Sequence, residues 1–197
     1  MEKINLGCYK DLFEKADGDE RSQASNWYPQ ANKIVMDISR KSGVTEEQVA
    51  GIIAVLSPLV EWSLNVKAAK VFIESRGRGR IPGFRKNREK ALAILKKNDL
   101  SQVRGPKVFE FYNTLLNPKH PIPVIDSQMI QAFYSDARLE KNDVSMIGGT
   151  KRREPLQKAV VRLAEERSLP VSTVQAQIWL TWKRLKGPYA NQLKLWK

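Results

Sequence analysis

Apolar residues recur every three or four positions along nearly the whole chain, which is the spacing of one face of an α-helix. No segment keeps the alternation of apolar and polar residues that marks a half-buried β-strand. The pattern predicts an all-α fold, with helices at residues 4–16, 27–42, 45–56, 62–75, 84–97, 107–117, 127–137, 153–168 and 172–185. A boundary between two lobes is expected near residues 118–125, although a long central helix is an equally good bridge.

Two of these helices begin with recognisable capping signals. Thr45 is followed three residues later by Gln48, which is the pattern of a capping box. Ser172 follows Pro170-Val171 and is expected to be the N-cap of the last helix. Both signals predict where a helix starts without reference to the apolar periodicity.

The chain is strongly basic. Its 197 residues include 34 Lys and Arg against 21 Asp and Glu, which gives a formal net charge of +13. Such an excess is typical of proteins that neutralise phosphates, so we expect a nucleic-acid partner. Membrane association is the main competitor, but the chain has no run of about 18 apolar residues and no secretory leader. We therefore expect a cytoplasmic protein without a membrane partner.

Cysteine and histidine are too scarce for several kinds of site. Cys8 is the only cysteine, which excludes an internal disulfide, a four-cysteine zinc site and a self-contained iron–sulfur cluster. His120 is the only histidine, and beside Pro121 a solvated surface role is expected for it. We expect neither a metal centre nor a redox cofactor.

Basic residues gather in two segments. The first, "SRGRGRIPGFRKNREK", is a Gly- and Arg-rich connection between predicted helices that includes Arg76, Arg78, Arg80, Lys86 and Arg88. The second is Lys151-Arg152-Arg153, at the start of a predicted helix, where a cation is unfavourable unless an anion approaches. Each segment is either a solvated surface or a set of DNA-binding phosphate contacts, and the net charge favours the contacts.

A turn at Gly105-Pro106 places Lys107 at the start of an apolar helix. Proline suits the first turn of a helix because its missing N–H needs no partner there, and glycine permits the tight turn before it. We expect short helices at about 99–104 and 107–117, joined by a hairpin whose outward backbone N–H groups bind a phosphate. The alternative is a solvated lysine at a frayed helix end.

Asp126 follows the Pro-rich loop "NPKHPIPVI" and precedes the predicted helix "SQMIQAFY". The simple interpretation is that Asp126 is an N-cap, a position that favours aspartate. The functional interpretation is that one carboxylate oxygen caps the helix while the other faces a cleft.

Gly105-Pro106-Lys107-Val108, followed downstream by Ile125-Asp126, resembles the helix-hairpin-helix, Gly/Pro-rich loop and aspartate signature of the HhH-GPD superfamily of DNA glycosylases. The upstream segment "IIAVLSPLVEWSLNVKAAKVF" resembles the helix, loop and helix that carry residues inserted into the DNA stack. The resemblance implies a two-lobed helical fold in one catalytic domain over residues 1–197, with the hairpin and catalytic loop at about 99–137. It also implies a monomer that acts on an extruded base of double-stranded DNA.

The resemblance assigns roles to individual residues. Asp126 is expected to stabilise the positive charge that develops on the sugar as the base leaves, or to activate the attacking water. Lys107 either attacks the sugar covalently or contacts a phosphate. The hairpin is expected to contact DNA through Val103, Arg104 and Gly105. The base pocket is expected to include Trp62, Asn65, Tyr28 and Gln128. A monovalent cation at the hairpin is compatible with the resemblance, which implies no other cofactor.

Two other functions stay open. The segments "NWYPQA", "AVLSPLVEWSLN", "GPKVFEFY" and "STVQAQIWLTWKR" together resemble short phage-encoded HhH-GPD-like proteins, whose relatives include enzymes of thymine hypermodification. In such a transferase Asp126 would deprotonate an incoming amine, while Lys107 and Arg104 would neutralise a pyrophosphate leaving group on 5-hydroxymethyluracil. A non-catalytic DNA-binding module would need only the hairpin and the basic surface.

Overall fold

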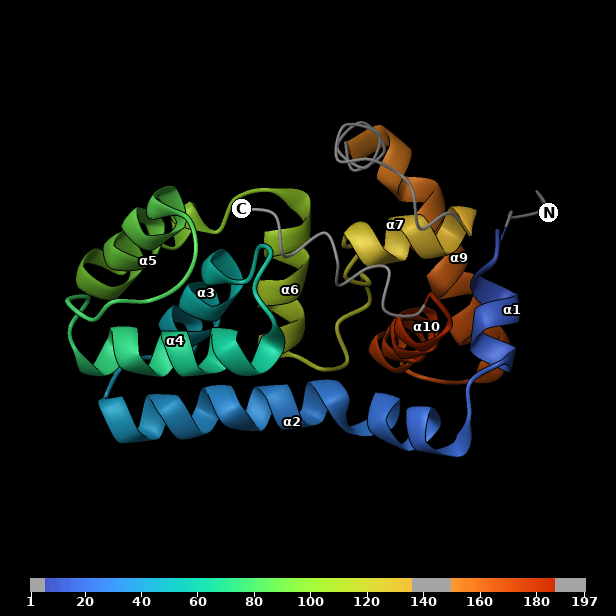
Figure 1. The fold of residues 1–197 in the computed structure, drawn as a ribbon, viewed down its shortest axis with the longest axis horizontal. Coiled ribbons are helices and arrows are strands. Elements are labelled where there is room, and N and C mark those ends of the chain that lie inside the picture. The colour runs from blue at the N-terminus through green and yellow to red at the C-terminus, as the bar shows by residue number, and fades with distance from the viewer. Residues whose placement is uncertain (1–5, 136–149, 187–197) are drawn as a thin grey trace. The chain divides into compact units, whose positions relative to one another are not determined.

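The computed structural model describes residues 6–135 and 150–186, and of residues 150–152 only the backbone. Every regular element in these residues is helical, which confirms the all-α prediction for this part of the chain (Figure 1). The elements are α1 (Tyr9–Glu14), α2 (Gly18–Ser42), α3 (Glu46–Leu56), α4 (Trp62–Glu74), α5 (Arg85–Lys97), the 3₁₀ turn η1 (Leu100–Gln102), α6 (Pro106–Leu116), α7 (Ser127–Tyr134), α9 (Thr150–Arg167) and α10 (Val171–Leu185). Within the described ranges no helix combines the length and the apolar character needed to cross a bilayer.

The chain divides into two compact units. The terminal unit comprises Met1–Tyr28 and Lys119–Lys197, and the central unit comprises Pro29–Pro118. One division falls at the Pro-rich loop, within the range expected from the sequence, and the other falls inside α2 at Pro29. Proline lacks the N–H that a helix interior requires, so one helical hydrogen bond is missing at this second division.

Helix α3 is the centre of the central unit. All residues from Val49 to Leu56 are buried, because α4, α5 and α6 pack against this helix (Figure 1). A helix that is apolar on all sides is stable only when other elements cover it. Its start is the predicted capping box, in which Gln48 N donates to Thr45 Oγ1 (3.2 Å) and Thr45 N donates to Gln48 Oε1 (3.3 Å). The helix ends at Leu56, so Ser57 begins the turn to α4.

Helices α1, α7, α9 and α10 enclose the core of the terminal unit. The Tyr9 side chain is fully buried in this core, and its hydroxyl donates a hydrogen bond to Met129 O of α7 (2.9 Å). Burial raises the pKa of Tyr9 well above its usual value, so the hydroxyl stays neutral in the core. The start of α7, where Asp126 lies, is therefore attached to a well-packed core.

Several helix starts differ from the sequence predictions, and α1 begins at Tyr9 rather than at residue 4. Helix α2 begins at Gly18 rather than at residue 27 because Asp17 and Glu20 cap it reciprocally. Glu20 N donates to Asp17 Oδ1 (2.8 Å), and Asp17 N donates to Glu20 Oε2 (3.1 Å). Helix α10 begins at Val171, so Pro170 is its N-cap and Ser172 lies inside the helix.

Candidate functional site

Lys107 lies in the first turn of α6 and contacts the loop after α3. Its ammonium group donates a hydrogen bond to Ser57 Oγ (2.5 Å) and lies 4.9 Å from the centre of the Phe111 ring. Trp62 packs edge-on against the same ring, with 6.1 Å between the ring centres. Lys107 is thus held at a defined place in the central unit, by Ser57, which is 50 residues earlier in the sequence, and by Phe111 of its own helix.

The Ser57 hydroxyl is arranged to accept a hydrogen bond from an ammonium group. It donates its own proton to Ala54 O (2.8 Å), so its oxygen presents lone pairs to Lys107. The Phe111 ring adds the electrostatic attraction of an aromatic face for a cation. These contacts offset the unfavourable interaction between the Lys107 ammonium and the helix dipole, which disfavours a positive charge in the first turn of α6. Ser57 lies in the segment at residues 52–72 that carries the upstream resemblance, but only the structure pairs it with Lys107.

The helical turn before α6 is shorter than the helix expected at residues 99–104. The predicted helix at 99–104 is the three-residue turn η1, and Asp99 caps this turn by accepting a hydrogen bond from Ser101 N (3.2 Å). Such a turn leaves few backbone groups for other partners, because its N–H groups bond within a span of a few residues.

The hairpin residues differ in burial and in their hydrogen bonds. The N–H groups of Val103 and Arg104 donate to carbonyls three and two residues earlier (3.0 Å and 2.8 Å). Both therefore bond inside the hairpin, and the Val103 side chain is buried, so the expectation of an outward Val103 N–H is wrong. The Arg104 side chain is exposed, and Gly105 has the positive φ (92°) that glycine adopts most readily. Of the three hairpin residues predicted to contact a phosphate, Arg104 and Gly105 are exposed.

Asp126 is the N-cap of α7, as predicted: Met129 N donates to its Oδ1 (2.9 Å). Its second oxygen is also engaged, because Trp179 Nε1 of α10 donates to Oδ2 (3.2 Å). The functional interpretation expects this oxygen to face a cleft, and the structure gives it a hydrogen-bond partner in α10. The residue is half-buried, and a carboxylate oxygen accepts more than one hydrogen bond, so both oxygens keep capacity for a substrate or a water.

The Arg-rich connection between α4 and α5 is largely exposed. Arg76, Arg78 and Arg80 all have exposed side chains, and so does Lys86. Arg88 has a different role, because its guanidinium donates to Gly77 O (3.0 Å) and Arg78 O (3.4 Å). Arg88 therefore holds the connection in place, while its neighbours present their charges to solvent.

The second basic segment is not a uniform charged surface. Arg153 is only 4% exposed, and its guanidinium donates to Ile125 O, next to Asp126. Arg153 thus has an internal role in the terminal unit, and its contact with DNA stays a prediction. The side chains of Lys151 and Arg152 lie outside the described part of the structure.

The residues predicted for the base pocket have different surroundings. Tyr28 is 3% exposed and its hydroxyl donates to Gln175 Oε1 (2.6 Å), so it belongs to the interior of the terminal unit. Asn65 is 1% exposed and donates through Nδ2 to Ile53 O (3.0 Å), which ties α4 to α3. Both side chains thus lie in the interior of their units, and their place in a base pocket stays a prediction. Trp62 and Gln128 are half-buried, and Gln128 Oε1 accepts no hydrogen bond from the described residues.

Leu59 stands out in the turn between α3 and α4. Its side chain is 79% exposed, and its φ of 61° is in the left-handed region that leucine rarely adopts. The turn also contains Ser57, which holds Lys107. Leu59 is thus an exposed apolar side chain two residues after Ser57, the residue that contacts Lys107. No sequence pattern indicated this exposure.

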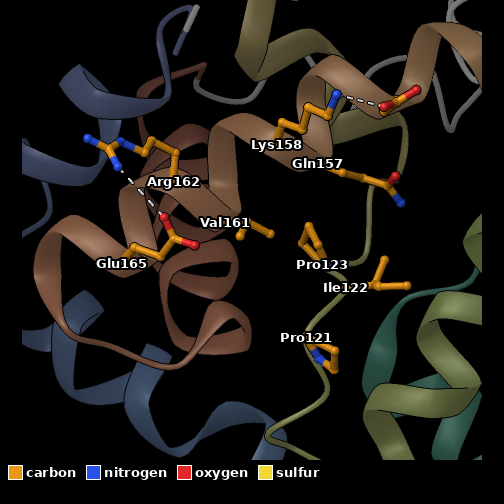
Figure 2. Close-up of a pocket in the computed structure, with 9 residues that line it drawn as sticks. Pro121, Ile122, Pro123, Gln157, Lys158, Val161, Arg162 and Glu165 are labelled. Carbon is orange, nitrogen blue, oxygen red and sulfur yellow. Dashed lines mark ion pairs between the residues drawn. The ribbon is translucent and has the colours of Figure 1, made fainter. Parts of the chain in front are cut away.

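A hollow of about 280 Å³ lies in the terminal unit between the Pro-rich loop and α9 (Figure 2). Pro121, Ile122 and Pro123 line one side, and Val161 of α9 points toward them from the other. An ion pair between Lys158 and Glu154 (2.7 Å) lies at its edge. None of the predicted site residues lines this hollow, so we do not assign the chemistry to it.

Among the described residues no group of three His, Cys, Asp or Glu side chains is placed to hold a metal ion. At the hairpin, the carbonyls of Leu100 and Gln102 already accept the N–H groups of the turn. Each carbonyl oxygen keeps a second lone pair, so a monovalent cation at the hairpin stays a prediction.

Residues 9–186 match the family of unknown function DUF7178, and the chain belongs to this family. Comparison with curated proteins and with solved structures finds no match. The family match spans both units.

Proposed function

We propose that the protein is a DNA glycosylase-like enzyme that acts on an extruded, modified base in double-stranded DNA. Asp126 is the carboxylate that assists cleavage of the N-glycosidic bond, and Lys107 is the cation that holds the DNA backbone beside the hairpin. The protein binds DNA mainly through phosphate contacts of the central unit.

The contact between Lys107 and Ser57 carries this proposal. The hairpin segment and the segment at residues 52–72 each resemble a different part of the same superfamily. In the central unit the lysine of one segment donates a hydrogen bond to the serine of the other (2.5 Å). Two separate resemblances that meet in one contact support a common function better than either alone.

The chemistry assigned to Asp126 follows from its position. As the base leaves, positive charge develops on the sugar, and a fixed carboxylate stabilises that charge or accepts a proton from the attacking water. Asp126 is fixed by two N–H donors and remains half-buried, so the carboxylate is oriented and still accessible to a substrate.

The assignment of DNA as substrate rests on charge and on exposed groups. The net charge is +13, and Arg76, Arg78, Arg80 and Arg104 are exposed in the central unit. Leu59 adds an exposed apolar side chain, of the kind that DNA-bending proteins insert between base pairs when a duplex is opened. The cost of extruding a base is a few kcal/mol, which such an insertion offsets.

The test is to incubate the protein with unmodified duplexes and with duplexes that contain 5-hydroxymethyluracil or its pyrophosphorylated form, and to identify the products by mass spectrometry. We expect a free base. An altered nucleoside in the presence of amines would instead indicate the transferase. If neither product appears while DNA is bound in a salt-dependent way, the enzyme proposal fails and the protein is a binding module.

A further inference from the structure

The Asp126 carboxylate is held by two helices. Capping α7 requires only one oxygen, and Met129 N occupies Oδ1 (2.9 Å). The second hydrogen bond, from Trp179 Nε1 to Oδ2 (3.2 Å), comes from α10, 53 residues further along the chain. One hydrogen bond leaves a carboxylate able to rotate about its Cβ–Cγ bond, whereas two bonds from different helices fix its plane.

Trp179 is itself held from two sides. Trp27 packs edge-on against its ring, with 6.3 Å between ring centres, and the Lys183 ammonium lies 4.2 Å from the ring centre. The direction of the indole N–H is therefore set by packing within the terminal unit. A donor whose direction is fixed also restricts the orientation of the group that accepts its hydrogen bond.

We propose that Trp179 is a positioning residue that orients the Asp126 carboxylate toward the substrate. The catalytic part of this inference rests on the proposed function, in which Asp126 acts on the sugar. A small misalignment of such a group lowers the rate without changing substrate binding, because the binding contacts lie elsewhere. The capping bond alone would preserve α7 but not the orientation.

The chain contains a matched control on the same helix. Trp182 lies three residues after Trp179 and is 5% exposed, and its Nε1 donates to none of the described residues. Changing either tryptophan to phenylalanine removes one indole N–H and part of one ring. Only Trp179→Phe removes a hydrogen bond to Asp126.

The first test needs no substrate. In ¹⁵N-labelled protein the five tryptophans give indole N–H signals, and Trp179→Phe and Trp182→Phe assign two of them. We expect Asp126→Asn to move the Trp179 signal and to leave the Trp182 signal in place. Asp17→Asn, which alters another capping aspartate of the same unit, should move neither. A Trp179 signal that does not respond to Asp126→Asn would overturn the inference even if Trp179→Phe failed to fold.

The second test measures single-turnover rates and DNA affinity on whichever substrate the wild-type protein converts. Trp179→Phe should lower the rate by about 10- to 100-fold with an unchanged Kd, and Trp182→Phe should leave the rate near that of the wild type. Equal rates for Trp179→Phe and the wild type would overturn the positioning role. If the wild type converts no DNA, the proposed function fails, while the indole signals still decide whether Trp179 holds Asp126.

Discussion

Lys107 and Asp126 both lie at the start of a helix, where the helix dipole disfavours the positive charge of Lys107 and favours the negative charge of Asp126. The positive end of the α7 dipole stabilises the Asp126 carboxylate, and the residue also supplies a cap, so folding alone accounts for an aspartate there. The same dipole at α6 disfavours Lys107, whose ammonium is held by a hydroxyl and an aromatic ring. A residue that the local fold disfavours is stronger evidence of function than one that the fold requires.

The largest effect is expected from Asp126→Asn. The amide keeps the size and the capping oxygen, so the free energy of unfolding should change by under about 1 kcal/mol. It cannot offset a developing positive charge or take up a proton, so turnover should fall about 100-fold or more. Turnover and thermal unfolding measured together check this.

The matched control for this change is Asp17→Asn. Asp17 also caps a helix of the terminal unit, through Glu20 N (2.8 Å). If Asp17→Asn lowers turnover as much as Asp126→Asn does, the loss in the Asp126 variant reflects helix capping rather than chemistry.

The next effect concerns the proposed phosphate contacts in the central unit. Replacing Arg78 and Arg80 by Gln should weaken binding to all DNA sequences alike and reduce the slope of log K against log salt by about two units. Lys10→Gln with Lys15→Gln removes the same charge from the terminal unit and should leave the slope unchanged. Binding titrations over a range of salt concentrations decide, and equal slopes in the wild type and the Arg78/Arg80 variant would remove this connection from the interface.

Substitutions at Lys107 should affect binding more than folding. Lys107→Gln loses the Ser57 and Phe111 contacts but also relieves an unfavourable dipole interaction, so unfolding should change by under about 1 kcal/mol. DNA affinity should fall about 10-fold, and Lys107→Arg should restore most of it, because a phosphate accepts either cation. Borohydride should trap no adduct; a trapped adduct that Lys107→Gln abolishes would make the lysine a nucleophile.

The smallest effect on folding is expected at Leu59. Leu59→Gly relieves a left-handed φ at the cost of greater freedom in the unfolded chain, so stability should stay equal or rise by up to about 1 kcal/mol. Affinity for duplex DNA should nevertheless fall a few-fold, while affinity for single strands should not. Leu64→Ala, at another exposed leucine of the central unit, serves as the control. A loss of stability in Leu59→Gly would show that this side chain serves the fold.

Much of the fold that the sequence predicts follows from local signals at the starts of helices. The capping box at Thr45, proline in the first turn of α6 and the aspartate cap of α7 each involve residues within four positions of one another. The start of α2 was missed although its signal is of the same kind, because Asp17 and Glu20 stand in a polar stretch without apolar periodicity.

The contacts that build the candidate site are not local. Trp179 reaches Asp126 across 53 residues, and the Tyr28 hydroxyl reaches Gln175 across 147. Periodicity indicates only that such side chains face inward. Arg153 shows the same limit, since its charge suggested exposure but a backbone carbonyl accepts its hydrogen bond in the interior.

The most direct test compares Lys107→Gln and Asp126→Asn in one experiment that measures DNA affinity and the single-turnover rate at saturating DNA. We predict that the two variants separate: Lys107→Gln loses affinity and keeps its rate within about 10-fold, whereas Asp126→Asn keeps or gains affinity and loses its rate about 100-fold. A folded, DNA-binding Asp126→Asn protein that turns over at the wild-type rate would contradict the assignment and leave Asp126 as a helix cap.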